Sequence, residues 1–408
     1  MRENLRLCSH FAASVLVACA PLCGFAAELQ KAADLDVAAQ TVQRQLRDYV
    51  FQNMLTEKPD ANVPSKTDGQ AEAFVGREDL YAIRGTGALP DCVPLNADPV
   101  QLIARRASQT SIVIINEHHA SPMDRDFVGR VLTALRTEGY SIYAAETFSQ
   151  YNNVDHVDAL GFDGWYSNEP IFGRTIRLAK TLGYSLVPYE QKRDQMEEAA
   201  KEAAGPESVI ARRKQIARRE QSQTDNLMAS IFKSRPDAKV VIHVGHSHVR
   251  ERAAPSSVDD GNVWMAQRLK EATGRDPLTI SQVDCRSPTA RVVIGKARLA
   301  QSGEGEIGSP VDLYVGHPRP EFQDGRPAWR QSIGDRVIEV PAAFRSREER
   351  VIIEARPEGA GLGVIPVDRL LLFPGENLPL LLPLGRYRID GFVEKARIES
   401  TPVVVDVE

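Results

Sequence analysis

The segment from Ser111 to His119, SIVIINEHH, constrains the fold of this chain more than any other. A β-branched apolar run ends abruptly in the polar residues Asn116, Glu117, His118 and His119. Such a run is typical of a strand that is buried on both faces of a parallel sheet. In open α/β sheets, ligands bind just beyond the carboxyl ends of the strands. We therefore expect the polar residues after this strand to lie at a functional site.

Three later segments repeat this pattern of an apolar run followed by chemically active side chains. The first run delivers Glu146, the second delivers Glu190, and the run AKVVIHV delivers His246 and His248. His243, inside the last run, is predicted to be a core histidine. If the four runs are neighbouring parallel strands, their polar residues share one sheet edge and form a metal or acid–base site. The residues expected at this edge are Glu117, His118, His119, Glu146, Glu190, His246 and His248.

Helical segments separate these runs, which places residues 80–288 in the α/β class. After the first strand, Pro122 fits the first helical position and Gly139 supplies the stop. Strand–helix–strand units of this kind are nearly always right-handed. The basic cluster from Ala211 to Arg219 is predicted to be the solvated face of a helix. We expect a mostly parallel sheet flanked by helices.

The chain changes character on either side of this α/β region. From residue 289 to 408, short β-rich runs alternate with Gly, Pro and charged turns, which predicts a C-terminal all-β, sandwich-like domain. His317, within it, is expected at the surface. Residues 27–79 are expected to form a helix, over 28–57, and a linker. A length of 408 residues agrees with two or three domains.

Residues 1–26 are predicted to be a targeting segment. Arg2 and Arg6 precede an apolar stretch too short to span a bilayer. Two outcomes are open: cleavage after Ala26, or lipidation of Cys19 in a sequence that resembles a bacterial lipobox. Either one predicts an exported protein in the periplasm of a bacterium or anchored to its outer membrane.

Cleavage after Ala26 would leave Cys92 and Cys285 as the remaining cysteines. They either pair in an oxidising compartment or remain two unpaired small residues. The formal charge of -5 and the pI near 6.0 give no electrostatic case for nucleic-acid binding. The oligomeric state stays open.

Between about residues 100 and 250, these motifs resemble the ChaN-like haem-iron-binding proteins and their relatives, the erythromycin esterases and the Tiki/TraB proteases. The Gly-Glu-x-His segment of that superfamily is matched by residues 116–119, and its second glutamate by Glu146. Its helical segment is matched around Asp225 and Asn226, and its final Gly-x-x-His by Gly245 and His248. Asn116 replaces the glycine of the pattern, so the backbone there leaves less room for a ligand.

The resemblance implies an envelope protein that binds haem iron or a metal ion. Tyr151 and Tyr166, in a long loop, are candidate haem ligands. Mixed imidazole and carboxylate donors suit Fe, Mn, Co or Zn. If the backbone stays extended, His246 and His248 share one face and can chelate one ion. The expected metal ligands are His119, His246, His248 and Glu146.

The alternative is a metal-dependent hydrolase of peptide or ester bonds, which resembles the Tiki-type proteases and the erythromycin esterases. A metal would activate water, and a glutamate would act as the general base. The residues expected to be catalytic are Glu117, His119, Glu146 and His248. The partner is accordingly haem iron or a small-molecule or peptide substrate. A third interpretation, a scaffold protein with a degenerate site, is supported only by Asn116.

Overall fold

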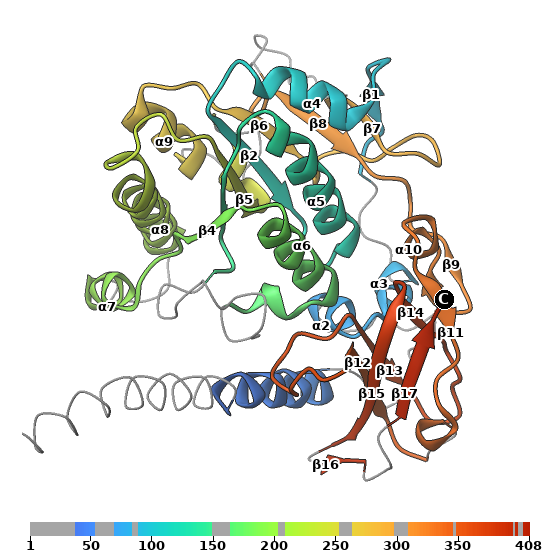
Figure 1. Ribbon diagram of the computed structural model, residues 1–408. Helices are drawn as coiled ribbons and strands as arrows, with labels where there is room; N and C mark the ends of the chain where they lie inside the picture. Colours follow the sequence, from blue (N-terminus) through green and yellow to red (C-terminus); the bar gives the residue numbers. More distant parts are fainter. Residues whose placement is uncertain are drawn as a thin grey trace, which may run out of the picture.

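The computed structural model describes residues 37–53, 69–83, 89–148, 164–202, 209–252, 263–297, 309–345, 348–394, 396–398 and 403–408. An eight-stranded sheet forms the centre of the molecule, in the order β1-β7-β8-β6-β2-β5-β3-β4 (Figure 1). Its parallel strands are β2 (Ile112–Glu117), β3 (Ile142–Ala145), β4 (Ser185–Pro188), β5 (Val240–Gly245), β6 (Leu278–Ser281) and β8 (Leu313–Gly316). The four predicted runs are therefore four adjacent parallel strands, as expected.

Helices cover both faces of this sheet, and each face has its own apolar core. One face is covered by α4 (Pro99–Ala107), α5 (Pro122–Thr137) and α6 (Pro170–Thr181). The other is covered by α8 (Val209–Leu227), a π-helical turn (Met228–Phe232) and α9 (Met265–Thr273), and α7 (Arg193–Glu202) precedes α8. Because both faces are buried, the central strands are almost entirely apolar. The predicted α/β fold is confirmed.

The large sheet continues past the predicted boundary at residue 288. Two β-rich runs assigned to the C-terminal domain instead form β7 (Val293–Ala297) and β8. β7 pairs antiparallel with both β8 and β1 (Cys92–Pro94). His317 directly follows β8 and is not a surface residue, because its Nε2 lies 2.8 Å from Oε1 of Gln282 and its side chain is only 10% exposed.

The rest of the C-terminal region is built mainly from strands, as predicted, and these strands pair antiparallel. Its main sheet has the path β13-β12-β15-β16, with β17 also paired to β15. The strands are β12 (Val351–Pro357), β13 (Asp368–Leu372), β15 (Gly385–Val393), β16 (Ala396–Arg397) and β17 (Val403–Val407). Smaller elements are β9 (Phe322–Gln323), β10 (Arg326–Pro327), α10 (Trp329–Ser332), β11 (Arg336–Ile338), a 3₁₀ turn (Ala342–Phe344) and β14 (Leu380–Leu382).

The N-terminal helix packs on this C-terminal sheet, although the two are far apart in sequence (Figure 1). Residues 37–53 are helical. α2 (Gly69–Phe74) lies in the segment that was expected to be a linker, and α3 (Glu78–Ile83) begins at its end. Leu46 and Val50 of the helix and Phe74 of α2 share one buried cluster with Ile352 and Leu371. The C-terminal domain is therefore completed by residues from the other end of the chain.

A disulfide joins Cys92 of β1 to Cys285, which follows β6. Of the two alternatives for these cysteines, the structure has the paired one. The predicted targeting segment, residues 1–26, lies outside the described residues. Among the helices that the structure describes, none is both long enough and apolar enough to cross a membrane.

Candidate functional site

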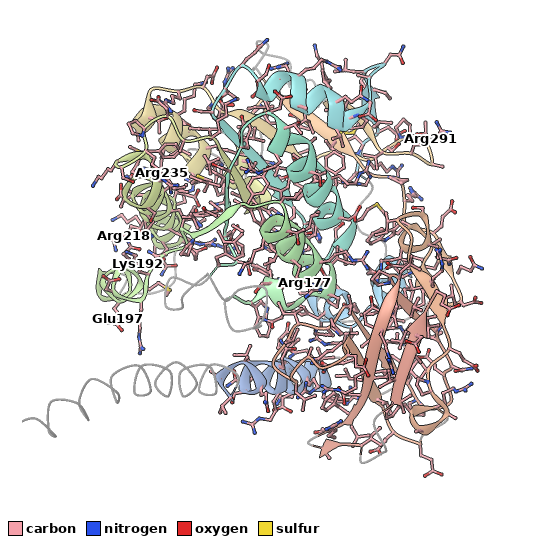
Figure 2. All side chains as sticks on the ribbon, viewed as in Figure 1. Arg177, Lys192, Glu197, Arg218, Arg235 and Arg291 are labelled. Carbon is pink, nitrogen blue, oxygen red and sulfur yellow. A yellow bond between two sulfur atoms is a disulfide. The ribbon has the colours of Figure 1, made fainter. Side chains whose placement is uncertain are left out.

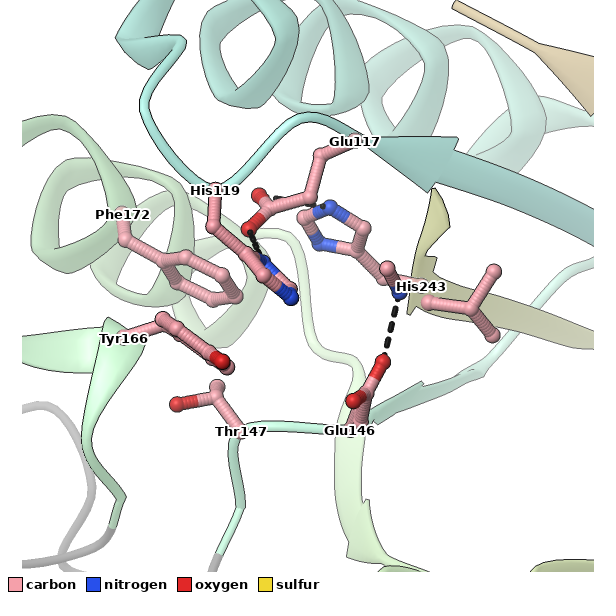
Figure 3. A pocket seen from close by; sticks show the side chains of 9 residues that line it. Glu117, His119, Glu146, Thr147, Tyr166, Phe172 and His243 are labelled. Atoms are coloured by element: carbon pink, nitrogen blue, oxygen red, sulfur yellow. Dashed lines mark hydrogen bonds and ion pairs between the residues drawn. The ribbon is translucent and has the colours of Figure 1, made fainter. Parts of the chain in front are cut away.

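The carboxyl ends of the adjacent parallel strands meet at a small cleft with a volume of about 10 Å³ (Figure 3). Its lining comes from β2 and the loop after it, from the turn after β3, from the end of β5, from the 3₁₀ turn Tyr166–Asn168 and from α6. The lining residues are Glu117, His119, Glu146, Thr147, Tyr166, Phe172, His243, Val244 and Gly245. The sequence pattern thus brings Glu117, His119 and Glu146 to one place.

Glu117 is the most heavily bonded residue of the cleft. Arg125 donates from Nε and Nη2 to its two carboxylate oxygens, at 2.8 and 2.9 Å. Nδ1 of His119 lies 3.0 Å from Oε1, and Nε2 of His243 lies 3.1 Å from Oε2. Burial alone would raise the pKa of Glu117, but Arg125, His243 and His119 hold it well below its usual value. Glu117 is therefore a carboxylate whose acceptor positions are filled.

Arg125 connects this carboxylate to the wall of the cleft. It comes from α5 and is fully buried. Besides its fork to Glu117, it donates from Nη1 to Oε2 of Glu169 at 3.2 Å and from Nη2 to the His119 carbonyl at 2.9 Å. Glu169 is also the N-cap of α6, where it accepts the N–H groups of Ile171 and Phe172. The β2 end, α5 and α6 are thus held in one buried polar network.

The ring of His119 is fixed on three sides. Tyr166 stacks on it, with ring centroids 3.8 Å apart and planes at 12°. Glu117 accepts from its Nδ1, and Gly245 lies so close that a Cβ there would be 2.5 Å from its Cε1. Because the carboxylate can only accept, Nδ1 is the donor of this hydrogen bond, and in the neutral ring Nε2 is then the acceptor. Nε2 faces the cleft and has no hydrogen-bond partner among the described residues.

Glu146 faces His119 across the cleft. Its Oε2 accepts the N–H of Gly245 at 2.5 Å, and its Oε1 accepts Nη2 of Arg219 at 2.5 Å. Burial would raise the pKa of Glu146, but His248, Arg219 and His119 lower it to about 2. At neutral pH the cleft therefore contains two ionised glutamates.

Arg219 was missed by the sequence interpretation, which placed it on a solvated helix face. Residues 212–215 of that cluster are exposed, and Arg218 lies toward the outside of the molecule in Figure 2. Arg219 instead bonds Glu146 and Glu190, with its Nε 3.1 Å from Oε1 of Glu190. Glu190 therefore lies at the predicted sheet edge, where it helps to hold Arg219.

The two histidines after β5 do not share one face, because the backbone does not stay extended. β5 ends at Gly245, and His246–Val249 form a 3₁₀ turn. His248 turns inward, with Nδ1 2.7 Å from Oε1 of Glu220 and Nε2 3.8 Å from Oε1 of Glu146. Burial would lower the pKa of His248, but Glu220 and Glu146 raise it. The expectation of chelation by two neighbouring rings on an extended strand was therefore wrong in its geometry.

His246 lies at the exposed rim instead. It has a left-handed backbone with φ 39°, and its carbonyl accepts Nδ2 of Asn116 at 2.6 Å. Its ring meets the rings of His118 and His119 edge to face, at 5.2 and 4.8 Å. Partial burial of the ring and the neighbouring His119 and His118 lower the pKa of His246 to about 4, so it is neutral at pH 7. Asn116, on the far side of β2 from the cleft, supports this turn.

The predicted metal and haem ligands fit the structure poorly. Guanidinium groups already occupy oxygens of both cleft glutamates, where a metal would need its carboxylate ligands. Within the described part of the chain, no three His, Cys, Asp or Glu side chains are placed to hold a metal ion. Tyr151 lies outside the described residues, and Tyr166 lies in a cleft of about 10 Å³, far below the roughly 300–1,000 Å³ typical of ligand pockets. Metal and haem binding stay predictions.

Comparisons with known proteins leave the family of this chain open. No family model matches the sequence, and no curated protein matches it. Among solved structures, the type III effector HopBA1 has 12% identity and a TM-score of 0.34, covering 57% of this chain and 99% of its own. A structure described as bacterial protein toxins has 16% identity and a TM-score of 0.31, and the match covers 46% of this chain and 37% of that one. RRSP, a MARTX toxin effector domain from Vibrio vulnificus CMCP6, has 14% identity and a TM-score of 0.31, and the match covers 61% of this chain and 45% of that one. At these scores the likeness carries no inference about function.

Proposed function

We propose that this protein hydrolyses ester or peptide bonds, with His119 as the general base. The observation that supports this is the imidazole of His119, whose Nδ1 is held by Glu117 while its Nε2 faces the cleft. A carboxylate that fixes one ring nitrogen leaves the other ready to accept a proton from water or a hydroxyl. The hydrolase interpretation of the sequence is therefore kept, with different roles for its residues.

In the first step, Nε2 of His119 takes a proton from a water molecule as its oxygen adds to the substrate carbonyl carbon. The carbonyl π electrons move to the oxygen, which becomes an oxyanion. When this intermediate collapses, the bond to the alcohol or amine breaks, and the leaving group takes the proton from His119. Glu117 and Glu146, both ionised, stabilise the imidazolium that exists between these steps.

Tyr166 is the candidate donor to the oxyanion. Its hydroxyl has no hydrogen-bond partner among the described residues, and its ring lies against His119. Burial and the neighbouring Glu146 raise its pKa to about 12, so it keeps its proton at neutral pH. A fixed O–H donor in a partly buried cleft is the kind of group that stabilises developing negative charge.

Glu117 is assigned an orienting role and not that of the base. Its oxygens already accept hydrogen bonds from Arg125 and His119, and its pKa is low. A carboxylate in this state has little tendency to take a proton from water. This changes the sequence hypothesis, in which a metal activated the water and a glutamate was the base.

The test is turnover of p-nitrophenyl esters and of a fluorogenic peptide library by the purified protein, with and without chelator. We expect the His119→Gln variant to hydrolyse these substrates about 100-fold more slowly than wild type, or slower still. Its circular dichroism spectrum should show that it remains folded. His118→Gln is the matched control, because its ring does not line the cleft. Equal rates for wild type and His119→Gln would refute the proposal.

Haem binding is the second candidate, and His246 favours it. This side chain is exposed at the rim, and its lowered pKa makes it a neutral imidazole, which is the form that binds iron. Titration with haemin would then produce a Soret band that is lost in His246→Ala. An unchanged haemin spectrum in the presence of wild-type protein would remove this candidate.

A further inference from the structure

The wall of the cleft that carries Tyr166 is held by parts of the chain outside the α/β unit. This wall, residues 164–169, includes the 3₁₀ turn Tyr166–Asn168. Within it, Asn168 donates to the Gly164 carbonyl at 2.6 Å, and the N–H of Ser167 donates to Oγ1 of Thr147 at 2.9 Å. These internal bonds shape the turn.

Asn168 is bonded to both ends of the chain at once. Nε2 of Gln43, in the N-terminal helix, donates to Oδ1 of Asn168 at 2.6 Å. Nη1 of Arg369, in β13, donates to the Asn168 carbonyl at 3.0 Å. The two outer residues are also joined, because Nη2 of Arg369 donates to Oε1 of Gln43 at 2.6 Å. All three are fully buried, so these bonds form a closed network that we call the Asn168 clasp.

An aromatic contact reinforces the clasp. The ring of Trp165 meets Tyr49 of the N-terminal helix at 5.1 Å and Phe74 of α2 at 5.4 Å, both edge to face. Such contacts are favourable geometries for aromatic pairs. Tyr166 therefore lies between two anchored residues. Trp165 is held by the N-terminal helix and α2, and Asn168 is held by the N-terminal helix and β13.

The other side of the same wall carries the site chemistry. Tyr166 stacks on His119, and Glu169 accepts from Arg125, which in turn holds Glu117. A shift of the wall would therefore move the proposed oxyanion donor and loosen the group that orients the base. Displacements of this kind near a reacting centre are costly to rate.

We propose that the Asn168 clasp is a positioning device that sets Tyr166 against His119. The N-terminal helix and the C-terminal β domain are then integral parts of the cleft, and Gln43 and Arg369 are its positioning residues. The proposal has two halves. The positional half, that the clasp holds the wall in place, does not depend on the hydrolase function. The catalytic half, that this placement of Tyr166 supports hydrolysis, rests on the proposed function.

The positional half is tested by amide hydrogen exchange in the full-length protein. Gln43→Ala removes two bonds of the clasp, and Gln45→Ala, an exposed residue of the same helix, is the matched control. Exchange in peptides covering residues 165–169 should accelerate about 5- to 10-fold in Gln43→Ala alone, as expected from the loss of about one net hydrogen bond. Peptides covering β2 should keep their protection. Equal exchange of residues 165–169 in both variants would overturn the proposal.

The catalytic half is tested by a double-mutant cycle for hydrolysis. If the clasp acts through Tyr166, Gln43→Ala should lower kcat about 5- to 10-fold in the wild type and have much less effect in Tyr166→Phe. Additive losses would overturn the link to Tyr166. Faster exchange in a protein with no hydrolytic activity would refute the proposed function and leave the positioning role of the clasp standing.

Discussion

Arg125 grips Glu117 through two parallel hydrogen bonds, at 2.8 and 2.9 Å, and both side chains are buried. A guanidinium fork of this kind matches a carboxylate geometrically and fixes its orientation. Because His119 is bonded to the same carboxylate, the fork also fixes the direction of its imidazole. The orientation of the proposed general base therefore depends on Arg125, an arginine of the neighbouring helix α5.

Replacement of Arg125 by alanine should destabilise the protein by about 3–5 kcal/mol, because it leaves a buried carboxylate without its counter-charge. Arg130→Ala, an exposed position of the same helix, should change the free energy of unfolding by less than about 0.5 kcal/mol. Urea denaturation of both variants measures the difference. A similar loss of unfolding free energy in both variants would show that the hydrogen bonds between Arg125 and Glu117 contribute little to stability.

Gly245→Ala should reduce hydrolysis by about 10-fold or more while the protein stays folded, because near-ångström displacements of reacting groups are costly. The added methyl carbon would lie 2.5 Å from Cε1 and 2.7 Å from Nε2 of His119, whose ring cannot retreat freely because Tyr166 covers its face. A kinetic assay combined with a thermal melt checks this. Wild-type turnover in Gly245→Ala would mean that the position of His119 is not critical.

Glu78 should give the protein a pH dependence opposite to that of most carboxylates. Burial raises its pKa from 4.5 to about 8, and its Oε2 is a buried atom with no hydrogen-bond partner among the described residues. Between these two values the unfolded chain has released the proton and the folded protein keeps it. The contribution of Glu78 is thus fully present below pH 4.5 and is lost as the pH rises to about 8.

The variant Glu78→Gln removes this titration and is the matched comparison. The free energy of unfolding of Glu78→Gln minus that of wild type should increase from pH 5 to pH 8 and level off above it. Denaturant titrations at several pH values measure it. A difference that is constant with pH would show that Glu78 is ionised in the folded protein.

Reduction of the Cys92–Cys285 disulfide should destabilise the α/β unit. The two cysteines are 193 residues apart, and chain-entropy arithmetic for a closed loop of that length gives about 5 kcal/mol. Thermal melts with and without a reductant, repeated for Cys92→Ser, measure the effect. A melting temperature that does not respond to the reductant in the wild type would contradict it.

The sequence predicted the parallel strands and the residues at their ends because these depend on local patterns. A β-branched run identifies each strand, and the sheet then gathers Glu117, Glu146 and Gly245 without further information. The pairing of β7 was not predictable in this way, because an antiparallel edge strand has the same pattern as a strand of a β domain. The contact of the N-terminal helix with β12 and β13 likewise depends on packing across the whole chain.

The residues missed at the site are those that act through tertiary contacts. Arg125 and Arg219 lie on helices, where an arginine is normally solvated and gives no sign of a buried partner. His243 is buried, as predicted for a core histidine, and its place in the cleft lining could have been found from strand register, since Gly245 lies opposite Glu117 and His243, two residues earlier, faces the same side. His246 and His248 were found, but the turn that separates them was not visible in their spacing.

Chemical rescue of His119→Ala by imidazole tests the central claim most directly. The variant should lose about 100-fold or more of the ester hydrolysis rate, and millimolar imidazole should restore part of it by supplying the missing ring nitrogen. The same concentration of imidazole should not raise the hydrolysis rate of the Tyr166→Phe variant. Wild-type turnover by His119→Ala, or a loss that imidazole does not reverse at any pH, would contradict the assignment of His119 as the base.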